Sequence, residues 1–222
     1  LIHLRVPREP DFAPETFDAP AIAERLGYVR RGPMFHHEVR VEFGTDESKT
    51  VTPPSRRVGT RFHSADDRYV LQLTDEGFTL SRLRPYESWE ALRDEARRTW
   101  EVYREVRAPS SITRVAVRFI NNLGLPLIEN LQLEAYLRCG PPLPVELPQL
   151  IGEFLQRLVV LDEASEVRTI FTQAWKDPPV DGRAPVILDI DCQLDRKFVA
   201  DGAAAFGQLE VLRVLTNRFF FE

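Results

Sequence analysis

The sequence predicts an α+β protein in which antiparallel sheets pack against helices. Several stretches alternate apolar and polar residues, as half-buried strands do, and two long stretches repeat apolar residues every three or four positions, as amphipathic helices do. Three strands followed by a helix are expected twice, over residues 57–107 and 157–218. Duplication of a strand-strand-strand-helix unit is one interpretation of this order, although the halves share a pattern rather than residue identities.

The first half is predicted to be rich in strands. They are expected at residues 34–43, 57–63, 69–73 and 78–80, with a loop over 44–56. A long helix then begins after Pro85 and ends at Pro109, with Trp89, Trp100 and Tyr103 on its apolar stripe. Packing in the core, rather than stacking on a ligand, is the expected role of these aromatic residues.

A further strand is expected at residues 115–119, ended by a turn over 121–124. The second half is predicted to contain two helices, three strands and a last helix. In chain order these are helices at 129–138 and 147–158, strands at 157–162, 167–175 and 186–195, and a helix at 203–218. We expect a strand-rich half with a long helix at 1–125 and a second half at 126–222, sharing one continuous core.

Composition and charge narrow the classes of function. The 222 residues are 43% hydrophobic and 28% charged, with a net charge of −5, which is ordinary for a globular protein but unfavourable for binding nucleic acid. Nucleic-acid binding stays an alternative through an arginine stripe. That stripe would consist of Arg56, Arg57, Arg61, Arg82 and Arg84. No apolar run approaches the roughly 20 residues that span a bilayer, so no membrane association is expected.

The two cysteines, Cys139 and Cys192, lie too far apart in the sequence to form a disulfide framework. Each is flanked by apolar positions, so both are expected to be buried free thiols. Free thiols are typical of a reducing compartment, which predicts a cytoplasmic protein.

Two groups of polar residues are candidate binding sites. Strand alternation puts Asp189 and Asp191 on one face, where they would bind a hard cation or do acid-base chemistry, or simply form a solvated sheet face. Arg118, Asn121 and Asn122 would receive a carboxylate or a phosphate. Alternatively, Arg118 pairs with the aspartates and the asparagines make a turn.

Adjacent His36 and His37 point to opposite faces of a strand and do not chelate one metal ion easily. His37 is expected to be a hydrogen-bonded core histidine. No nucleophile elbow, phosphate-binding glycine loop or zinc-ligand spacing occurs in the sequence. No catalytic residue, metal site or cofactor is therefore predicted, and the sequence favours a protein that is not an enzyme.

The segment from Tyr86 to Asn122 carries a resemblance. Tyr86-Glu87-Ser88-Trp89 opens the long helix, and Arg118-Phe119-Ile120-Asn121 lies in the following strand. The chain resembles a sporadically distributed family of uncharacterised prokaryotic proteins with a Tyr-x-x-Trp helix start and an Arg-Tyr-Ile-Asn strand. Phe119 replaces the usual Tyr, and Asn122 stands where a basic residue is common. The patchy distribution of the family implies an accessory role, such as defence or toxin neutralisation.

These observations favour a non-catalytic protein whose sheet or edge binds another protein, and they leave self-association open. The first alternative is a metal-assisted or small-molecule-acting enzyme that uses Asp189, Asp191 and Arg118. The second is a nucleic-acid-binding module.

Overall fold

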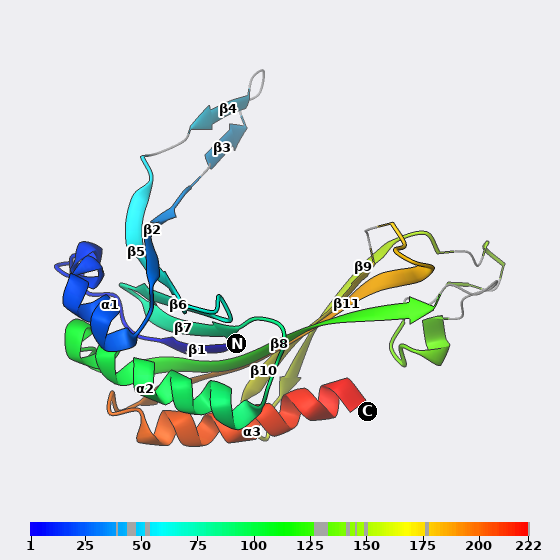
Figure 1. Ribbon diagram of the computed structural model, residues 1–222. Helices are drawn as coiled ribbons and strands as arrows, with labels where there is room; N and C mark the ends of the chain where they lie inside the picture. Colours follow the sequence, from blue (N-terminus) through cyan, green and yellow to red (C-terminus); the bar gives the residue numbers. More distant parts are fainter. Residues whose placement is uncertain are drawn as a thin grey trace. The chain divides into compact units, whose positions relative to one another are not determined.

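The computed structural model describes residues 1–38, 40–43, 48–51, 54–126, 133–140, 143–144, 146–148, 151–175 and 178–221. Its main feature is a nine-stranded antiparallel sheet in the order β2-β5-β6-β7-β1-β8-β11-β10-β9 (Figure 1). These strands are β1 (Ile2–Arg5), β2 (Arg30–His36), β5 (Arg56–His63), β6 (Tyr69–Thr74), β7 (Gly77–Arg82), β8 (Ile112–Pro126), β9 (Phe154–Asp162), β10 (Val167–Trp175) and β11 (Arg183–Phe198). The predicted α+β fold is confirmed.

The remaining elements are one small hairpin and the helices. The hairpin pairs β3 (Arg40–Phe43) with β4 (Ser48–Val51). The helices are α1 (Pro20–Leu26), α2 (Trp89–Arg107) and α3 (Ala203–Phe221), with 3-10 turns η1 (Pro14–Asp18) and η2 (Leu133–Ala135). By its contacts the chain divides into two compact units, 1–115 with 196–206, and 116–195 with 207–222. We call them unit 1 and unit 2.

Helix α2 covers one face of the strands of unit 1 (Figure 1). The Ser88 side chain accepts a hydrogen bond from the Ala91 backbone N–H at 3.1 Å and caps the first turn. Trp100 and Tyr103 are fully buried and contact Phe78 of β7 edge-on, with ring centroids 5.7 and 6.2 Å away. The predicted packing role of these aromatic residues is confirmed.

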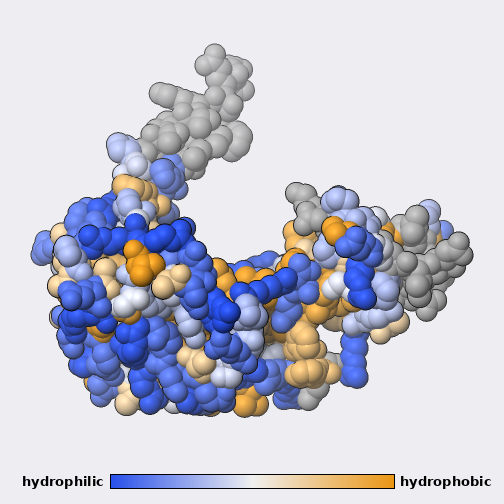
Figure 2. All heavy atoms as spheres, in the orientation of Figure 1, coloured by the Kyte–Doolittle hydropathy of each residue, from blue (hydrophilic) through white to orange (hydrophobic). Residues whose placement is uncertain are grey.

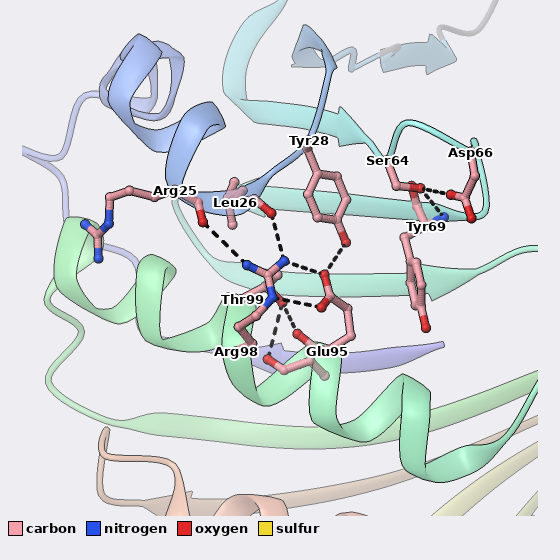
Figure 3. Close-up of polar contacts among 10 residues, drawn as sticks. Arg25, Leu26, Tyr28, Ser64, Asp66, Tyr69, Glu95, Arg98 and Thr99 are labelled. Carbon is pink, nitrogen blue, oxygen red and sulfur yellow. Dashed lines mark hydrogen bonds and ion pairs between the residues drawn. The ribbon is translucent and has the colours of Figure 1, made fainter.

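A polar cluster joins α1 to α2 within the same unit (Figure 3). The Arg98 guanidinium donates to the Leu26 carbonyl at 2.8 Å and to the Glu95 carboxylate at 2.6 Å. The Tyr28 hydroxyl donates to the same carboxylate at 2.9 Å. Burial, together with the charge of Glu95, raises the pKa of Tyr28, so its hydroxyl stays protonated and keeps donating. Arg98 thereby satisfies a carbonyl at the C-terminal end of α1 that has no partner inside the helix.

In unit 2, alternate residues of the strands face the C-terminal part of α3. Arg213 of α3 lies over the Phe119 ring at 4.8 Å, and Phe219 contacts Phe171 of β10 with ring centroids 6.2 Å apart. A separate small core lies further along the strands. It consists of Leu125, Leu133, Leu137, Trp175, Ala184 and Val186.

The structure confirms the strands predicted near 57–80 and 167–195 and both long helices, and it corrects four other elements. The loop expected over 44–56 contains a strand, β4, at residues 48–51. The strand expected at 34–43 is two strands in different sheets, β2 and β3, and Val39 lies outside the described residues. The expected helix at 147–158 is wrong, because β9 begins at Phe154. The turn expected at 121–124 is also wrong, since β8 continues to Pro126.

Strand β1 and helix α1 were not predicted, although β1 lies inside the sheet between β7 and β8. Of the helix expected at 129–138, residues 129–132 lie outside the described residues, and Leu133–Ala135 forms a 3-10 turn.

His3 of β1 makes stability depend on pH. Burial, reinforced by the positive charges of Arg114 and Arg5, lowers its pKa to about 4 from the ordinary 6.5. Below about pH 6.5 the His3 imidazole therefore binds a proton in the unfolded chain but not in the folded chain. The free energy of unfolding consequently falls as the pH drops towards 4. Above pH 6.5 this contribution is constant.

Between pH 7 and pH 4, His3 should lower the free energy of unfolding of the wild-type chain by up to about 3 kcal/mol. We expect His3→Gln not to show this part of the loss. Urea unfolding at several pH values measures this loss. His36→Gln is the matched control, because it makes the same substitution at an exposed position. Equal profiles for the wild-type chain and His3→Gln would contradict the prediction.

Candidate functional site

Arg118 and Asp189, both predicted site residues, form an ion pair on the outer face of the sheet in unit 2. The Arg118 Nε and Nη2 atoms donate to the two carboxylate oxygens of Asp189 at 2.8 and 2.5 Å. The Asp189 hydrogen bonds raise the pKa of Arg118 further, so the guanidinium stays charged. The fork geometry uses both carboxylate oxygens, which leaves Asp189 poorly placed to hold a cation.

Asp191 belongs to a second polar group on that face. Gln193 Nε2 donates to Asp191 Oδ2 at 2.6 Å, and Arg168 Nη1 donates to Gln193 Oε1 at 3.4 Å. The opposite face of β11 is buried, as strand alternation predicted. It consists of Leu188, Ile190, Cys192 and Leu194. The aspartate-lined face is thus a hydrogen-bonded surface of the sheet.

Asn121 and Asn122 do not join Arg118 in one anion cradle. Strand alternation puts Asn121 on the side of Phe119, and its Nδ2 donates to the Leu188 carbonyl at 3.3 Å. Asn122 is exposed on the other side of the strand. The two amides therefore point to opposite faces, because β8 continues through them as a strand.

The histidine and cysteine predictions need correction at two positions. His37 is exposed rather than part of the core, because β2 ends at His36. Cys139 is an exposed free thiol, whereas Cys192 is buried as predicted, and burial raises the pKa of its thiol to about 11. Among the described residues, no group of three His, Cys, Asp or Glu side chains would hold a metal ion.

Members of the predicted arginine stripe bind acidic side chains of unit 1. Arg56 contacts Asp75 at 2.5 Å, and Arg57 contacts Asp18 at 2.5 Å. Arg82 contacts Glu87 at 2.6 Å and lies over the Tyr69 ring. Their positive charges are largely neutralised by these partners, which weakens attraction to a phosphate backbone.

Strand β9 has features of a binding surface that sequence reasoning missed. It is the last strand in the order of the described sheet, and it pairs along its length with β10 alone. Its exposed apolar side chains lie on both faces. They are Leu155 (75% exposed), Leu158 (37%), Val159 (42%), Val160 (40%) and Leu161 (68%). Hydrophobic side chains also reach the surface in the space-filling view, in the region where Figure 1 draws β9, β10 and the end of α3 (Figure 2).

The other edge strand, β2, shows what a protected edge looks like. It carries Arg30, Arg31 and Pro33, and its register with β5 shifts between Met34 and Phe35. Charged residues, proline and a bulge are devices that stop an edge from pairing with another strand. Strand β9 carries exposed charges only at Arg157 and Asp162. Residues 154–162 contain no proline or glycine, and the pairing of β9 with β10 runs through nine residue pairs without a shift. Strand β9 is therefore competent to accept a further strand.

No protein-family model matches the chain, and neither does a curated protein or a solved structure. The family resemblance of Tyr86–Asn122 therefore stays a prediction. Within the described part of the chain, no helix has the length and hydrophobicity needed to cross a membrane.

The Arg118–Asp189 pair is testable by a double-mutant cycle. For Arg118→Gln, Asp189→Asn and the double variant, we expect a coupling free energy of about 0.5–1 kcal/mol that shrinks as salt is added, as for half-exposed ion pairs. Chemical unfolding measures it. A parallel cycle with Glu163→Gln, in the exposed turn after β9, should show no coupling. Equal coupling in the two cycles would contradict a direct ion pair.

Proposed function

We propose that the chain is a non-catalytic protein-binding module that adds an extended segment of a partner protein to the outer edge of β9. The observation that carries this proposal is a nine-residue edge strand with five exposed apolar side chains and without proline, glycine or a bulge. In an antiparallel strand every second residue directs its backbone N–H and C=O away from the existing neighbour. About four residues of β9 would thus offer paired donors and acceptors to an incoming strand.

The apolar side chains supply the affinity that backbone hydrogen bonds alone do not. Leu155 and Leu161 are the most exposed apolar side chains of the strand and share its outer face with Val159 and Arg157. Covering Leu155 and Leu161 would contribute on the order of 3 kcal/mol from removal of apolar surface from water. An extended partner segment with apolar residues at alternate positions matches this surface, because its side chains continue the faces of the sheet.

The alternatives receive less support from the geometry. A metal-assisted enzyme would need carboxylates directed at one point, whereas Asp189 is engaged by Arg118 and Asp191 accepts from Gln193. A nucleic-acid-binding module would need free positive charge, whereas Arg57 and Arg82 are ion-paired.

We place this binding activity in the cytoplasm of a prokaryote. An exposed free thiol at Cys139 suits a reducing compartment, where it would not be oxidised. Capture of an extended segment would serve the accessory role in defence or toxin neutralisation that the family resemblance implies. Strand addition is a common way to sequester a partner chain.

The proposal predicts that charge on β9 abolishes partner binding without unfolding the chain. We expect the double variant Leu155→Lys/Leu161→Lys to fold normally, because both side chains are largely exposed, and to bind at least tenfold more weakly. Affinity purification from the native host, followed by hydrogen exchange of the purified complex, measures both effects. In the wild-type complex the amides of residues 154–162 should gain protection.

Val29→Lys/Val199→Lys is the matched control, since both valines are as exposed as the two leucines but lie outside β9. This control should bind like the wild type. Equal loss in both double variants, or protection at β2 instead of β9, would contradict the proposal. A concentration-dependent dimer of the purified chain that Leu155→Lys/Leu161→Lys disrupts would assign the edge to a second copy instead.

A further inference from the structure

Unit 2 contains a pocket of about 710 Å³ on the helix-facing side of β9 and β10. Alternate residues of β10 form its floor, β9 forms one wall, and the end of α3 forms another. Its lining includes Leu158, Val160, Thr169, Phe171, Gln173 and Phe219. This volume falls in the range of roughly 300–1,000 Å³ that is typical of small-molecule sites.

Two separate packing contacts lie on the pocket side of β10, one at Phe171 and the other at Trp175. Phe171 is covered by Phe219 of α3. Trp175, four residues further along the same face, packs into the small core with Leu137. Gln173 lies between them on that face and belongs to neither contact, yet only 2% of its surface is exposed.

The side chain of Gln173 indicates which chemical group a ligand would carry. Its Oε1 atom is buried and has no hydrogen-bond partner among the described residues. The same holds for Oε1 of Gln156, which lies directly opposite Gln173 on β9. A buried acceptor without a donor costs about 1–3 kcal/mol, a penalty that a bound donor removes. Leu158, Val160 and Phe171 add apolar surface to the lining beside Gln173.

We propose that this pocket binds a neutral, predominantly apolar small molecule whose hydroxyl or amine N–H donates a hydrogen bond to Gln173 Oε1. Apolar walls favour an uncharged body, because a buried charge would lack a counter-charge beside Gln173. Charged side chains line the pocket at Arg138, Asp162 and Arg218, and all three are exposed. This site is distinct from the outer face of β9, and it goes beyond partner binding.

A probe with one N–H donor tests the site. N-phenyl-1-naphthylamine is neutral and apolar and fluoresces strongly in apolar surroundings, and its N-methyl analogue lacks the donor. We expect saturable binding at one site per chain, with at least tenfold preference for the N–H probe. Gln173→Leu keeps the volume but removes the acceptor, so it should abolish the preference and still bind the N-methyl analogue.

Two variants of adjacent residues test whether the probe binds in this pocket. Val160→Trp fills the pocket and should weaken binding of the N–H probe at least tenfold, whereas Val159→Trp, on the other face of β9 and equally exposed, should not. Bound probe should also slow alkylation of the exposed Cys139 thiol, which lines the pocket, by several-fold. Circular dichroism checks that each variant is folded.

Absence of saturable binding would overturn the proposal, as would equal binding by folded Val160→Trp and Val159→Trp. An unchanged preference in Gln173→Leu would overturn the assignment of the donor. If Val160→Trp does not fold, the preference test with Gln173→Leu and the protection of Cys139 decide the outcome. Leu155→Lys/Leu161→Lys should bind the probe like the wild type, so failure of partner binding and failure of this site are distinguishable.

Discussion

The register between β9 and β10 decides what unit 2 presents to its surroundings. The strands pair without a shift from Val167 opposite Asp162 to Trp175 opposite Phe154. Because side chains alternate, this register directs Leu158 and Val160 towards the pocket and Leu155 and Leu161 away from it. A slip of one residue would exchange the two sets, opening the pocket wall to Val159 and putting Gln156 on the outer face. Both proposed binding surfaces depend on this one pairing.

The free energies of the polar interactions in unit 2 show which polar groups indicate a ligand site. The Arg118–Asp189 pair has the geometry of a specific site, but a half-exposed ion pair contributes only about 0–1 kcal/mol and is common on sheet surfaces. An unsatisfied buried amide oxygen costs about 1–3 kcal/mol and is uncommon in native proteins. Gln173 is therefore a stronger indication of a ligand than the more conspicuous cluster of arginine and aspartates.

Strand alternation and helical periodicity predicted much of the fold because tertiary contacts reinforce them. The pattern of β5 to β7 and of β10 and β11 is visible in the sequence, since one face of each strand is buried. Four-residue β1 is too short to show a pattern, and only its position between β7 and β8 makes it a strand. Leu147 to Leu158 fits a helical stripe equally well, and pairing with β10 decides in favour of β9.

The candidate residues were less predictable than the elements that carry them. Sequence spacing correctly put Asp189 opposite the buried face of β11, and it allowed the pairing with Arg118 that the structure shows. It interpreted Asn121 and Asn122 as a turn because amides favour turns, whereas the long strand β8 places them on opposite faces. The exposure of β9 and the buried, unpartnered amide oxygen of Gln173 depend on tertiary packing, and no local pattern encodes them.

The two proposed surfaces share a strand but use different parts of it. A partner segment would pair with the outer backbone edge of β9 and cover Leu155 and Leu161, whereas a pocket ligand would contact Leu158 and Val160. These inner side chains are themselves 37% and 40% exposed, so part of their surface is not covered by the walls of the pocket. An added strand would place its own inward side chains next to them, because neighbouring strands lie about 4.8 Å apart. The outer edge of β9 thus borders the pocket. Both proposed surfaces depend on the incomplete burial of the side chains of β9.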